Sequence, residues 1–576
     1  MVAHTFDLVI RGGEVFDGTG GAGRAADVAI RSGRIAEIGK VLGSGSEEID
    51  ARGKIVTPGF VDIHTHYDGQ ASWSSSLTPS SLHGTTTVVM GNCGVGFAPV
   101  HPTDHGALID LMEGIEDIPG AAMSEGLKWN WTSFPDFLDA IDARPHDLDI
   151  CAQLPHCAMR LYVMGERALR HEPATAGDIA KMRSIVADAI RAGAFGVSTS
   201  RTKSHRSASG LATLTLLAAE DELLGIALGV KDAGRGVLQG ISDWGEGRTD
   251  DFELFRRVVE KTGVPMSMTV NQNFDKPDWW RELIAKLEAA RAAGLPMTGQ
   301  VGVRAIGMVL GLESNVHSFA YHPSYRQIRE YPLAQKVAVM QDPAFKRKLL
   351  EEARALSGHP SEAHRAKYHE QWDRIFFLDD SPDYEPSPDK SLAAMSARTG
   401  KSPLELMYDR MLEDDGQGLL YQPHVNYMTG NLDVCAAMLA STATVPGGGD
   451  GGAHVSMICD ASNTTYLLSH WGRDRSGGKF DIGWLIKRHT ADTARAVGLT
   501  DRGILAPGMK ADLNVIDFGR LRLRKPRMHY DLPAGGKRLL QQAQGYEATV
   551  LSGVITHRND QATGALPGRL VRSGSL

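Results

Sequence analysis

A regular alternation of short apolar strands and amphipathic helices across the middle of the chain constrains the fold most strongly. Eight segments have the length and composition of buried strands: residues 59–63, 85–90, 149–153, 196–199, 237–241, 266–270, 298–303 and 444–447. Helical stretches separate several of them, for example residues 175–191, 218–233, 250–261 and 279–293. Strands that alternate with helices form parallel sheets, and about eight strands favour a closed barrel. The sequence therefore predicts an α/β fold, a (β/α)8 TIM-type barrel.

The first sixty residues are typical of short strands joined by tight turns. Residues 6–10 and 14–16 are expected to form a hairpin around the turn Arg11-Gly12-Gly13. Residues 27–30 are expected to pair with residues 35–38 across Ser32-Gly33.

The C-terminal region of the chain shows the same pattern of short strands and tight turns. Residues 511–517 are strand-like, and residues 548–551 meet 554–557 across Ser552-Gly553. Neither end alone buries much surface, so we expect both to build one small β-sandwich domain. The predicted division is a composite β domain of residues 1–56 and 503–576 and a barrel of residues 57–502.

The stretch between residues 306 and 418 departs from the alternation. It has helical pieces, a Pro- and Asp-rich segment at 379–390 and no clear strand. We interpret it as a helical insertion before the last barrel strand. Loops on the active face of a barrel carry function, so one interpretation is a lid over the site. The other is a surface elaboration or a contact between copies in a homo-oligomer.

Composition excludes several classes of function. The chain has 576 residues and a formal net charge of −8, which disfavours nucleic acid and acidic membranes as partners. The basic run at 520–527 is interpreted as a solvated edge. No apolar run reaches the roughly 18 residues of a membrane span. Five cysteines without a CxxC pair, and an N-terminus unlike a signal peptide, indicate reduced thiols and a cytoplasmic location.

The strongest chemical signal is His64-Thr65-His66, directly after the apolar strand GFVDI. Residues two apart in a strand point to the same side, so both imidazoles are expected to project together. At the carboxyl end of a parallel strand they meet the mouth of the barrel, where active sites gather. Neutral imidazole is the commonest ligand of divalent metals. This position predicts half of a metal site.

A glycine-rich segment, PGGGDGGAH, follows the last strand and carries Asp450 and His454. Residues 447–452 satisfy G-x-G-x-x-G, but no acidic residue in a βαβ context follows, which argues against a nucleotide site. The glycines are expected to let the backbone turn sharply beside a ligand. For His454, orienting Asp450, contacting substrate and structural packing remain open.

Several motifs carry a resemblance to a known family. TPGFVDIHTHYD resembles the metal motif of the amidohydrolase superfamily, and LVIRGGEVFDG and GILAPGMKADLNVID are similar to the entry and exit of its composite β domain. GTTTVVMGNCGVGFAP and the acidic segment IEDIPG resemble the N-acyl-D-amino-acid deacylase (D-aminoacylase) branch. The resemblance covers nearly the whole chain and is weakest in the insertion.

The resemblance implies roles for two further residues. Cys93, in GNCG, corresponds to a cysteine that binds metal in D-aminoacylases, and a thiolate is a good zinc ligand. The alternative is a buried, inert thiol. Asp450 corresponds to the carboxylate with which this superfamily binds metal and transfers a proton. The implied metal ligands are His64, His66, Cys93 and Asp450, with Asp450 also catalytic.

The sequence departs from the family after the fifth and sixth strands, where members usually carry metal-binding histidines. Amides stand there instead: Gln239, Asn271 and Gln272. Neutral amides are poor zinc ligands. Either the site holds one ion rather than two, or ligands come from elsewhere, with His205 and His424 as candidates. A carbamylated Lys203 is the less favoured alternative.

Substrate contacts are assigned to five residues: Arg201, His205, Arg304, Tyr427 and His454. An acyl amino acid has a carboxylate that a guanidinium can bind through two hydrogen bonds, which suggests Arg201 and Arg304 after their strands. A structural salt bridge is an equally good explanation of either arginine.

The sequence as a whole predicts a zinc-dependent hydrolase of carbon–nitrogen bonds other than peptide bonds, with one or two divalent ions and a small-molecule substrate. The resemblance implies an N-acyl-D-amino-acid deacylase or a related amidase. A cyclic amide or lactone hydrolase, or a deaminase, is the alternative within the superfamily, because the metal-activated water serves all three. A catalytically inactive, metal-free binding or assembly protein is the alternative from another class.

Overall fold

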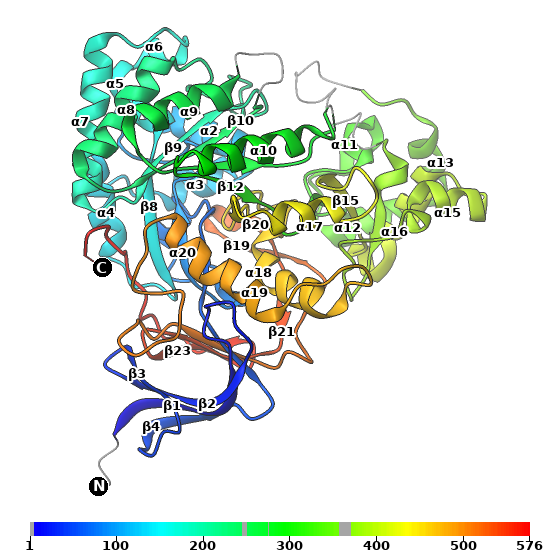
Figure 1. Cartoon of the computed structure of the whole chain (residues 1–576). Coiled ribbons are helices and arrows are strands. Elements are labelled where there is room, and N and C mark those ends of the chain that lie inside the picture. The colour runs from blue at the N-terminus through cyan, green and yellow to red at the C-terminus, as the bar shows by residue number, and fades with distance from the viewer. Residues whose placement is uncertain (1–4, 245–249, 275, 356–369, 576) are drawn as a thin grey trace.

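A curled sheet of eight parallel strands forms the centre of the molecule (Figure 1). The computed structural model describes residues 5–244, 250–274, 276–355 and 370–575. The sheet contains, in chain order, β6 (Phe60–Asp62), β7 (Thr85–Met90), β8 (Asp149–Pro155), β9 (Gly196–Arg201), β10 (Val237–Ser242), β11 (Met266–Val270), β12 (Met297–Val301) and β16 (Thr444–Pro446). Each of the eight predicted segments overlaps one of these strands, and the predicted α/β barrel is confirmed.

Helices cover the outside of the sheet (Figure 1). The four predicted ones are α7 (Ala176–Ala192), α8 (Glu220–Ala233), α9 (Asp251–Thr262) and α10 (Trp279–Ala292). Between β6 and β9 lie α1 (Gln70–Trp73), α2 (His105–Glu116), α3 (Gly120–Gly126), α4 (Phe134–Asp142), α5 (His156–Met164) and α6 (Glu166–Leu169). Helix α7 begins with a capping box in which Thr175 and Asp178 satisfy each other's backbone N–H groups.

The barrel closes between its first and last strands, β6 and β16. These strands are short, and the residues that follow them make the junction: Thr65 and Gly451 form a parallel bridge. The Asp450 N–H donates to the His64 carbonyl at 3.0 Å, and the His66 N–H donates to the Gly451 carbonyl at 2.7 Å. The glycine-rich segment is therefore fixed against the two histidines.

Glycines in this segment are required by its close approach to β6 and to the residues that follow that strand. A Cβ atom on Gly449 would lie 2.1 Å from Asp62 Oδ2, and one on Gly451 would lie 2.5 Å from Ser80 Oγ. Carbon atoms essentially never approach other heavy atoms this closely, so a side chain would push the segment away. The sequence interpretation, a sharp turn beside a ligand, omitted this packing.

A second sheet has nine strands and joins the two ends of the chain. Its N-terminal strands are β1 (Phe6–Val15), β2 (Arg24–Arg31), β3 (Arg34–Gly39), β4 (Gly45–Asp50) and β5 (Ile55–Pro58). Its C-terminal strands are β17 (Leu513–Ile516), β22 (Tyr546–Leu551), β23 (Val554–Arg558) and β24 (Gln561–Ala562). Strand β5 pairs antiparallel with β17, which connects the two halves. The exact boundaries of the composite and barrel domains stay a proposal.

One predicted hairpin is wrong. Residues 6–15 form the single strand β1, and the expected turn at Arg11-Gly12-Gly13 is an irregularity in its pairing with β2. Gly12 has a φ of 67°, which lets the strand bulge without reversing. The two other predicted pairings, β2 with β3 and β22 with β23, are present.

Buried ion pairs connect the segment that precedes β17 to the start of the barrel strand β8. Asp149, at the start of β8, accepts from Arg502 at 2.7 Å and pairs with Lys510 at 3.0 Å. Burial alone would raise the pKa of Asp149, but the two cations outweigh it and lower that pKa. Breaking such a pair would leave an uncompensated buried charge.

The region between residues 306 and 418 contains strands that the sequence analysis did not predict. Strands β13 (Ile306–Leu310) and β14 (Phe376–Leu378) flank β15 (Leu419–Val425) in an antiparallel sheet. The described part of this region contains the helices α11 (Pro323–Ile328), α12 (Leu333–Met340), α13 (Pro343–Glu351), α15 (Leu392–Thr399) and α16 (Pro403–Gly416). They pack around their own apolar core to one side of the barrel (Figure 1). The prediction failed because β14 is short and both strands pair with a partner distant in sequence.

The chain after β15 returns to the barrel. Helix α17 (Asp433–Ala440) precedes β16, and α18 (Asn463–Tyr466), α19 (Ile482–Lys487) and α20 (Thr493–Ala496) follow it. Two short antiparallel pairs, β18 (Arg522–Leu523) with β21 (Ala543–Gln544) and β19 (Arg527–Leu532) with β20 (Gly536–Leu540), lie before β22. Among the described residues no helix combines the length and apolar character that crossing a membrane requires.

The Pro- and Asp-rich segment at 379–390 is anchored to the barrel through Glu385. This carboxylate accepts from His470 Nε2 at 2.7 Å, Arg475 Nη2 at 2.9 Å and the Leu432 N–H at 2.8 Å. Burial would raise the pKa of Glu385, but the hydrogen bonds from His470 and Arg475 outweigh it and lower the pKa from 4.5 to about 2.

We expect Gly449→Ala to lower the free energy of unfolding by about 1–3 kcal/mol, because the added methyl group collides with Asp62 across the barrel closure. Thermal melting measures the loss. Gly478→Ala is the matched control, because nothing lies within 4 Å of its Cβ position. Equal melting temperatures for the two variants would contradict the close packing.

We expect the Glu385 anchor to weaken in acid. Its pKa is lower in the folded chain, so its contribution is complete above pH 4.5 and is lost as the pH falls from 4.5 toward 2. The shift corresponds to about 3 kcal/mol. The melting temperatures of wild type and Glu385→Gln should therefore differ most near pH 7 and converge below pH 4.5. A difference between the two melting temperatures that is as large at about pH 3 as at about pH 7 would contradict the anchor.

Candidate metal centre

Three potential metal ligands lie together at the carboxyl end of the barrel strands. His64 and His66 follow β6, and Cys93 follows β7; their ligand atoms all lie within 4.8 Å of one another, and all three residues are buried. Cys93 Sγ lies 3.4 Å from His64 Nε2. The pairing of β6 with β7 brings the two ligand segments together.

Asp450 reaches the same point from the other side of the barrel closure. Its Oδ1 atom lies 3.6 Å from His64 Nε2 and 3.8 Å from His66 Nε2. The Asp450 side chain is 15% exposed, whereas the two histidine side chains are 4% and 1% exposed. Asp450 is therefore the member of this group that solvent or a substrate can reach most readily.

The backbone at the site is strained at three residues. Cys93, Asp450 and His454 have φ values of 55°, 46° and 49°, in the left-handed region that residues other than glycine rarely adopt. Such conformations cost about 1–3 kcal/mol each and persist only where the surroundings enforce them, typically at functional sites. The surroundings here are the barrel strands and the closure described above.

A hydrogen-bond chain fixes the orientation of the His64 ring. His64 Nδ1 lies 2.7 Å from Gln300 Oε1, and Gln300 Nε2 donates to Ser267 Oγ at 2.9 Å. Because the amide nitrogen of Gln300 is engaged, its oxygen accepts the proton on Nδ1. The lone pair of His64 Nε2 then faces Cys93 and Asp450, as ligation of a metal requires. Gln300, a polar residue inside strand β12, was missed in the sequence analysis.

The electrostatics of the site favour a bound cation. Burial raises the pKa of the Cys93 thiol well above its usual value, and the carboxylates of Glu116 and Asp450 raise it further. Burial and the neighbouring imidazoles lower the pKa of His66, which keeps that ring neutral. A metal ion stabilises a thiolate and binds a neutral imidazole, so it would relieve both effects.

The residues present fit a divalent cation. Two imidazoles, one thiol and one carboxylate form a donor set of the kind that binds zinc. Among the described residues, His66 Nδ1 and Glu116 Oε1 are buried without a hydrogen-bond partner, although they lie 3.5 Å apart. Buried polar atoms are normally satisfied, so this contact is an incompletely paired one beside the candidate ligands.

The amides at the fifth and sixth strand positions support loops around the site. Gln239 Oε1 accepts from the Cys93 N–H at 3.1 Å and so holds the cysteine loop. Asn271 Oδ1 accepts from Asn426 Nδ2 at 3.2 Å, and Gln272 Oε1 accepts from the Met428 N–H at 3.1 Å. These side chains act through loop backbones and neighbouring side chains.

Two of the predicted substrate-contact residues lie near the histidines. Burial, followed by His454 and His64, lowers the pKa of His205 to about 3, and its Nδ1 atom lies 3.0 Å from Ser200 Oγ. His454 Nε2 lies 3.7 Å from Glu116 Oε2. The Lys203 side chain, the less favoured carbamylation candidate, is exposed.

The other three predicted substrate contacts are engaged with protein partners. Arg201 pairs with Asp251 at 3.2 Å, and Arg304 pairs with Asp460 at 2.9 Å. The Tyr427 hydroxyl donates to the Pro386 carbonyl. Each of these side chains is buried. The salt-bridge explanation of the two arginines therefore has direct structural partners, and their role toward substrate stays a prediction.

Glu116 is a site residue that the sequence analysis did not name. It is the last residue of α2 and is 2% exposed. Its carboxylate lies between His66 and His454. The segment IEDIPG was used for the family resemblance alone, and an acidic residue at the end of an apolar helix was the available signal.

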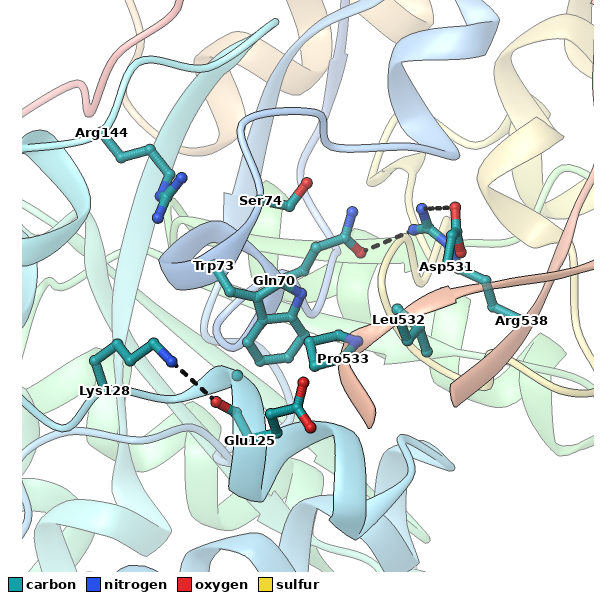
Figure 2. A pocket seen from close by; sticks show the side chains of 11 residues that line it. Gln70, Trp73, Ser74, Glu125, Lys128, Arg144, Asp531, Leu532, Pro533 and Arg538 are labelled. Carbon is teal, nitrogen blue, oxygen red and sulfur yellow. Dashed lines mark hydrogen bonds and ion pairs between the residues drawn. The ribbon is translucent and has the colours of Figure 1, made fainter. Parts of the chain in front are cut away.

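A separate cavity of about 420 Å³ lies away from these residues (Figure 2). Gln70 and Trp73 of α1, Glu125 of α3 and the Asp531–Arg538 ion pair of the β19–β20 hairpin line it. Arg538 also contacts Gln70 Oε1 at 3.3 Å, so the hairpin is bound to α1 across the cavity (Figure 2). None of the predicted site residues belongs to its lining.

We expect the purified chain to contain at least one divalent cation, and His66→Ala and Cys93→Ala to lose it, because each change removes a ligand from the group. Elemental analysis measures the content. Cys435→Ala, which removes a buried cysteine of α17, is the control and should retain the metal. Wild type without metal, whose melting temperature neither zinc nor cobalt changes, would disprove the site.

The chain resembles known proteins in sequence and in fold. D-aminoacylase of Alcaligenes xylosoxydans xylosoxydans is 30% identical over 293 residues, 50% of this chain and 56% of that relative, so the match spans little more than half of the relative. A D-aminoacylase structure superposes with a TM-score of 0.65 at 23% identity, covering 98% of this chain and 100% of the other. The structure of N-acyl-D-glutamate deacylase from Bordetella bronchiseptica superposes with a TM-score of 0.64 at 22% identity. The match covers 99% of this chain and 100% of that one.

The structural matches show the shared fold. A family model, Amidohydro_3, described as the amidohydrolase family, matches residues 47–557. That range includes the predicted ligands His64, His66, Cys93 and Asp450 together with the whole barrel. The chain is a member of the amidohydrolase family.

Proposed function

We propose that this chain is a metal-dependent hydrolase that cleaves the amide bond of N-acyl D-amino acids. The observation that carries the proposal is the convergence of His64, His66, Cys93 and Asp450 where the barrel closes. Membership of the amidohydrolase family supports amide hydrolysis. The relative named D-aminoacylase supports the acyl D-amino acid as the substrate class.

The metal that we propose is zinc, held by the two imidazoles, the Cys93 thiolate and Asp450. When bound at such a site, a divalent cation polarises the scissile carbonyl and lowers the pKa of a water molecule toward about 7. A structural neighbour was determined with zinc, which supports this choice.

One ion per chain is the stoichiometry that we propose. A binuclear metal centre is described for D-aminoacylase. In this chain, Gln239 at the fifth strand accepts from the Cys93 N–H, and Asn271 at the sixth accepts from Asn426. Neutral amides bind zinc poorly, and these two are already engaged.

Asp450 is the residue that we assign to proton transfer. Its carboxylate takes the proton of the attacking water and returns it to the leaving amine, which departs as the free amino acid. Its partial exposure and its position beside both imidazoles suit a group that must contact the reacting atoms. The hydrogen bond from the Asp450 N–H to the His64 carbonyl fixes the backbone, so that only the side chain has to move during proton transfer.

The remaining side chains around the site have supporting roles in this proposal. Gln300 holds the His64 ring and Gln239 holds the Cys93 loop. His205, whose lowered pKa keeps its ring neutral, and His454 are polar groups suited to contact the acyl or amino side of the substrate. The substrate-contact assignments of Arg201, Arg304 and Tyr427 require a rearrangement of their present partners.

At saturating zinc, we expect Asp450→Asn to lower kcat by about 100- to 10,000-fold while KM changes little, because the amide keeps the shape of the side chain and cannot accept the proton. Steady-state kinetics on N-acetyl D-amino acids measures this. Asp188→Asn is the matched control and should keep kcat, because Asp188 lies on the surface of α7 and pairs with Arg191. Full activity of Asp450→Asn would refute the proton-transfer role.

A substrate panel separates the alternatives within the superfamily. N-acetyl D-amino acids should be hydrolysed, whereas their L-enantiomers, cyclic amides, lactones and aminopurines should not. Turnover of a cyclic amide alone would replace the deacylase by a cyclic amidase on the same metal site. Metal binding without turnover of any compound would favour a binding protein and refute the proposed activity.

A further inference from the structure

We propose that Glu116 and Asp117, the acidic corner at the end of α2, position the metal site: Glu116 orients His66, and Asp117 holds the segment that follows Asp450. The inference rests on the proposed function in so far as His66 and Asp450 are the ligands being held. Neither acidic residue contacts the reacting atoms in this scheme, so both are positioning residues.

The first half of the corner acts on His66. Glu116 Oε1 lies 3.5 Å from His66 Nδ1, and both atoms are buried and have no hydrogen-bond partner among the described residues. His66 Nε2 faces Asp450 Oδ1 on the other side of the ring. A carboxylate opposite Nδ1 keeps the proton on that nitrogen and leaves the Nε2 lone pair for a metal. Glu116 thus stands opposite His66 as Gln300 stands opposite His64, at 3.5 Å rather than at the 2.7 Å of the Gln300 hydrogen bond.

The second half of the corner acts on the segment after Asp450. The Glu116 carbonyl accepts the His454 N–H, and Glu116 Oε2 lies 3.7 Å from His454 Nε2. Asp117 Oδ2 accepts from the Ser456 hydroxyl at 2.6 Å and from its N–H at 3.3 Å. Asp117 adopts a left-handed φ of 50°, which ends the helix and turns its carboxylate to this segment.

Helix α2 is itself fixed to a third part of the site, the loop after β9. A Cβ on Gly114 would lie 2.1 Å from the Ser207 carbonyl carbon, so the helix lies directly against that loop. The Asp110 carbonyl accepts the Ala208 N–H, and Asp110 Oδ1 accepts the Ser209 N–H, both at 2.9 Å. The same loop carries His205. The C-terminal half of α2, with Asp117 after it, thus contacts the three segments that carry His66, His454 and His205.

The test of the first half measures metal affinity directly. Metal-stripped wild type, Glu116→Gln and Glu116→Ala are titrated with zinc against a chromophoric chelator. We expect about 10- to 100-fold weaker zinc binding in Glu116→Ala and a smaller loss in Glu116→Gln, which keeps an acceptor oxygen. Glu113→Gln, an exposed residue of the same helix, is the matched control and should bind as wild type does. Wild-type affinity in Glu116→Ala would overturn the role of Glu116.

Kinetics at saturating zinc distinguishes positioning from catalysis. If Glu116 acts through His66, excess zinc should restore most of kcat in Glu116→Gln with KM unchanged. A loss of kcat that zinc does not restore would overturn the positioning role in favour of a direct one. Normal zinc affinity in wild type without turnover of any substrate would refute the proposed function while leaving this inference intact.

The role of Asp117 is tested with variants that leave Glu116 unchanged. This test therefore still holds if the Glu116 variants do not fold. Asp117→Asn, Ser456→Ala and the double variant form a cycle. Because the two residues act through one contact, the double variant should lose no more zinc affinity than the stronger single variant. Additive losses, or none, would overturn the role of Asp117.

Discussion

The closure of the barrel is the constraint on which the metal site depends. Strands β6 and β16 are too short to seal the sheet by themselves, and two backbone hydrogen bonds between the residues that follow them complete the ring. Those same residues carry His64, His66 and Asp450. The residues that close the barrel are therefore also the residues of the candidate metal site. The glycines at 449 and 451 are needed for both, because a side chain at either position would keep the glycine-rich segment away from the residues around β6.

The side chains around the barrel closure include several acidic groups and little uncompensated positive charge. Burial raises the pKa of Glu116, and Asp450 and Asp68 raise it further. The nearby guanidinium of Arg304 is already neutralised by Asp460. The imidazole of His66 stays neutral. A bound metal ion would stabilise this buried group of acidic side chains and neutral imidazoles, and metal binding would then be coupled to the stability of the fold.

The barrel could be predicted from sequence because each strand is a short apolar run. His64 was proposed as a ligand because it follows the first of these runs, whereas the role of Asp450 was implied by the family resemblance. Side chains whose role depends on a facing atom could not. Gln300 looks like one polar residue in a strand, and Glu116 like one acid at a helix end, until His64 and His66 are seen opposite them. Strand β14 was missed because its partner lies far along the chain.

The nine-stranded sheet has a consequence for how the chain is made. Its N-terminal half is synthesised first, yet Lys54 meets its partner Asp517 across 463 positions of sequence. Until that partner emerges, β5 presents an open edge that other strands can join. Contacts of such long range form slowly and leave partly folded chains prone to association. Productive folding during synthesis thus depends on keeping that edge covered while the barrel forms between its two halves.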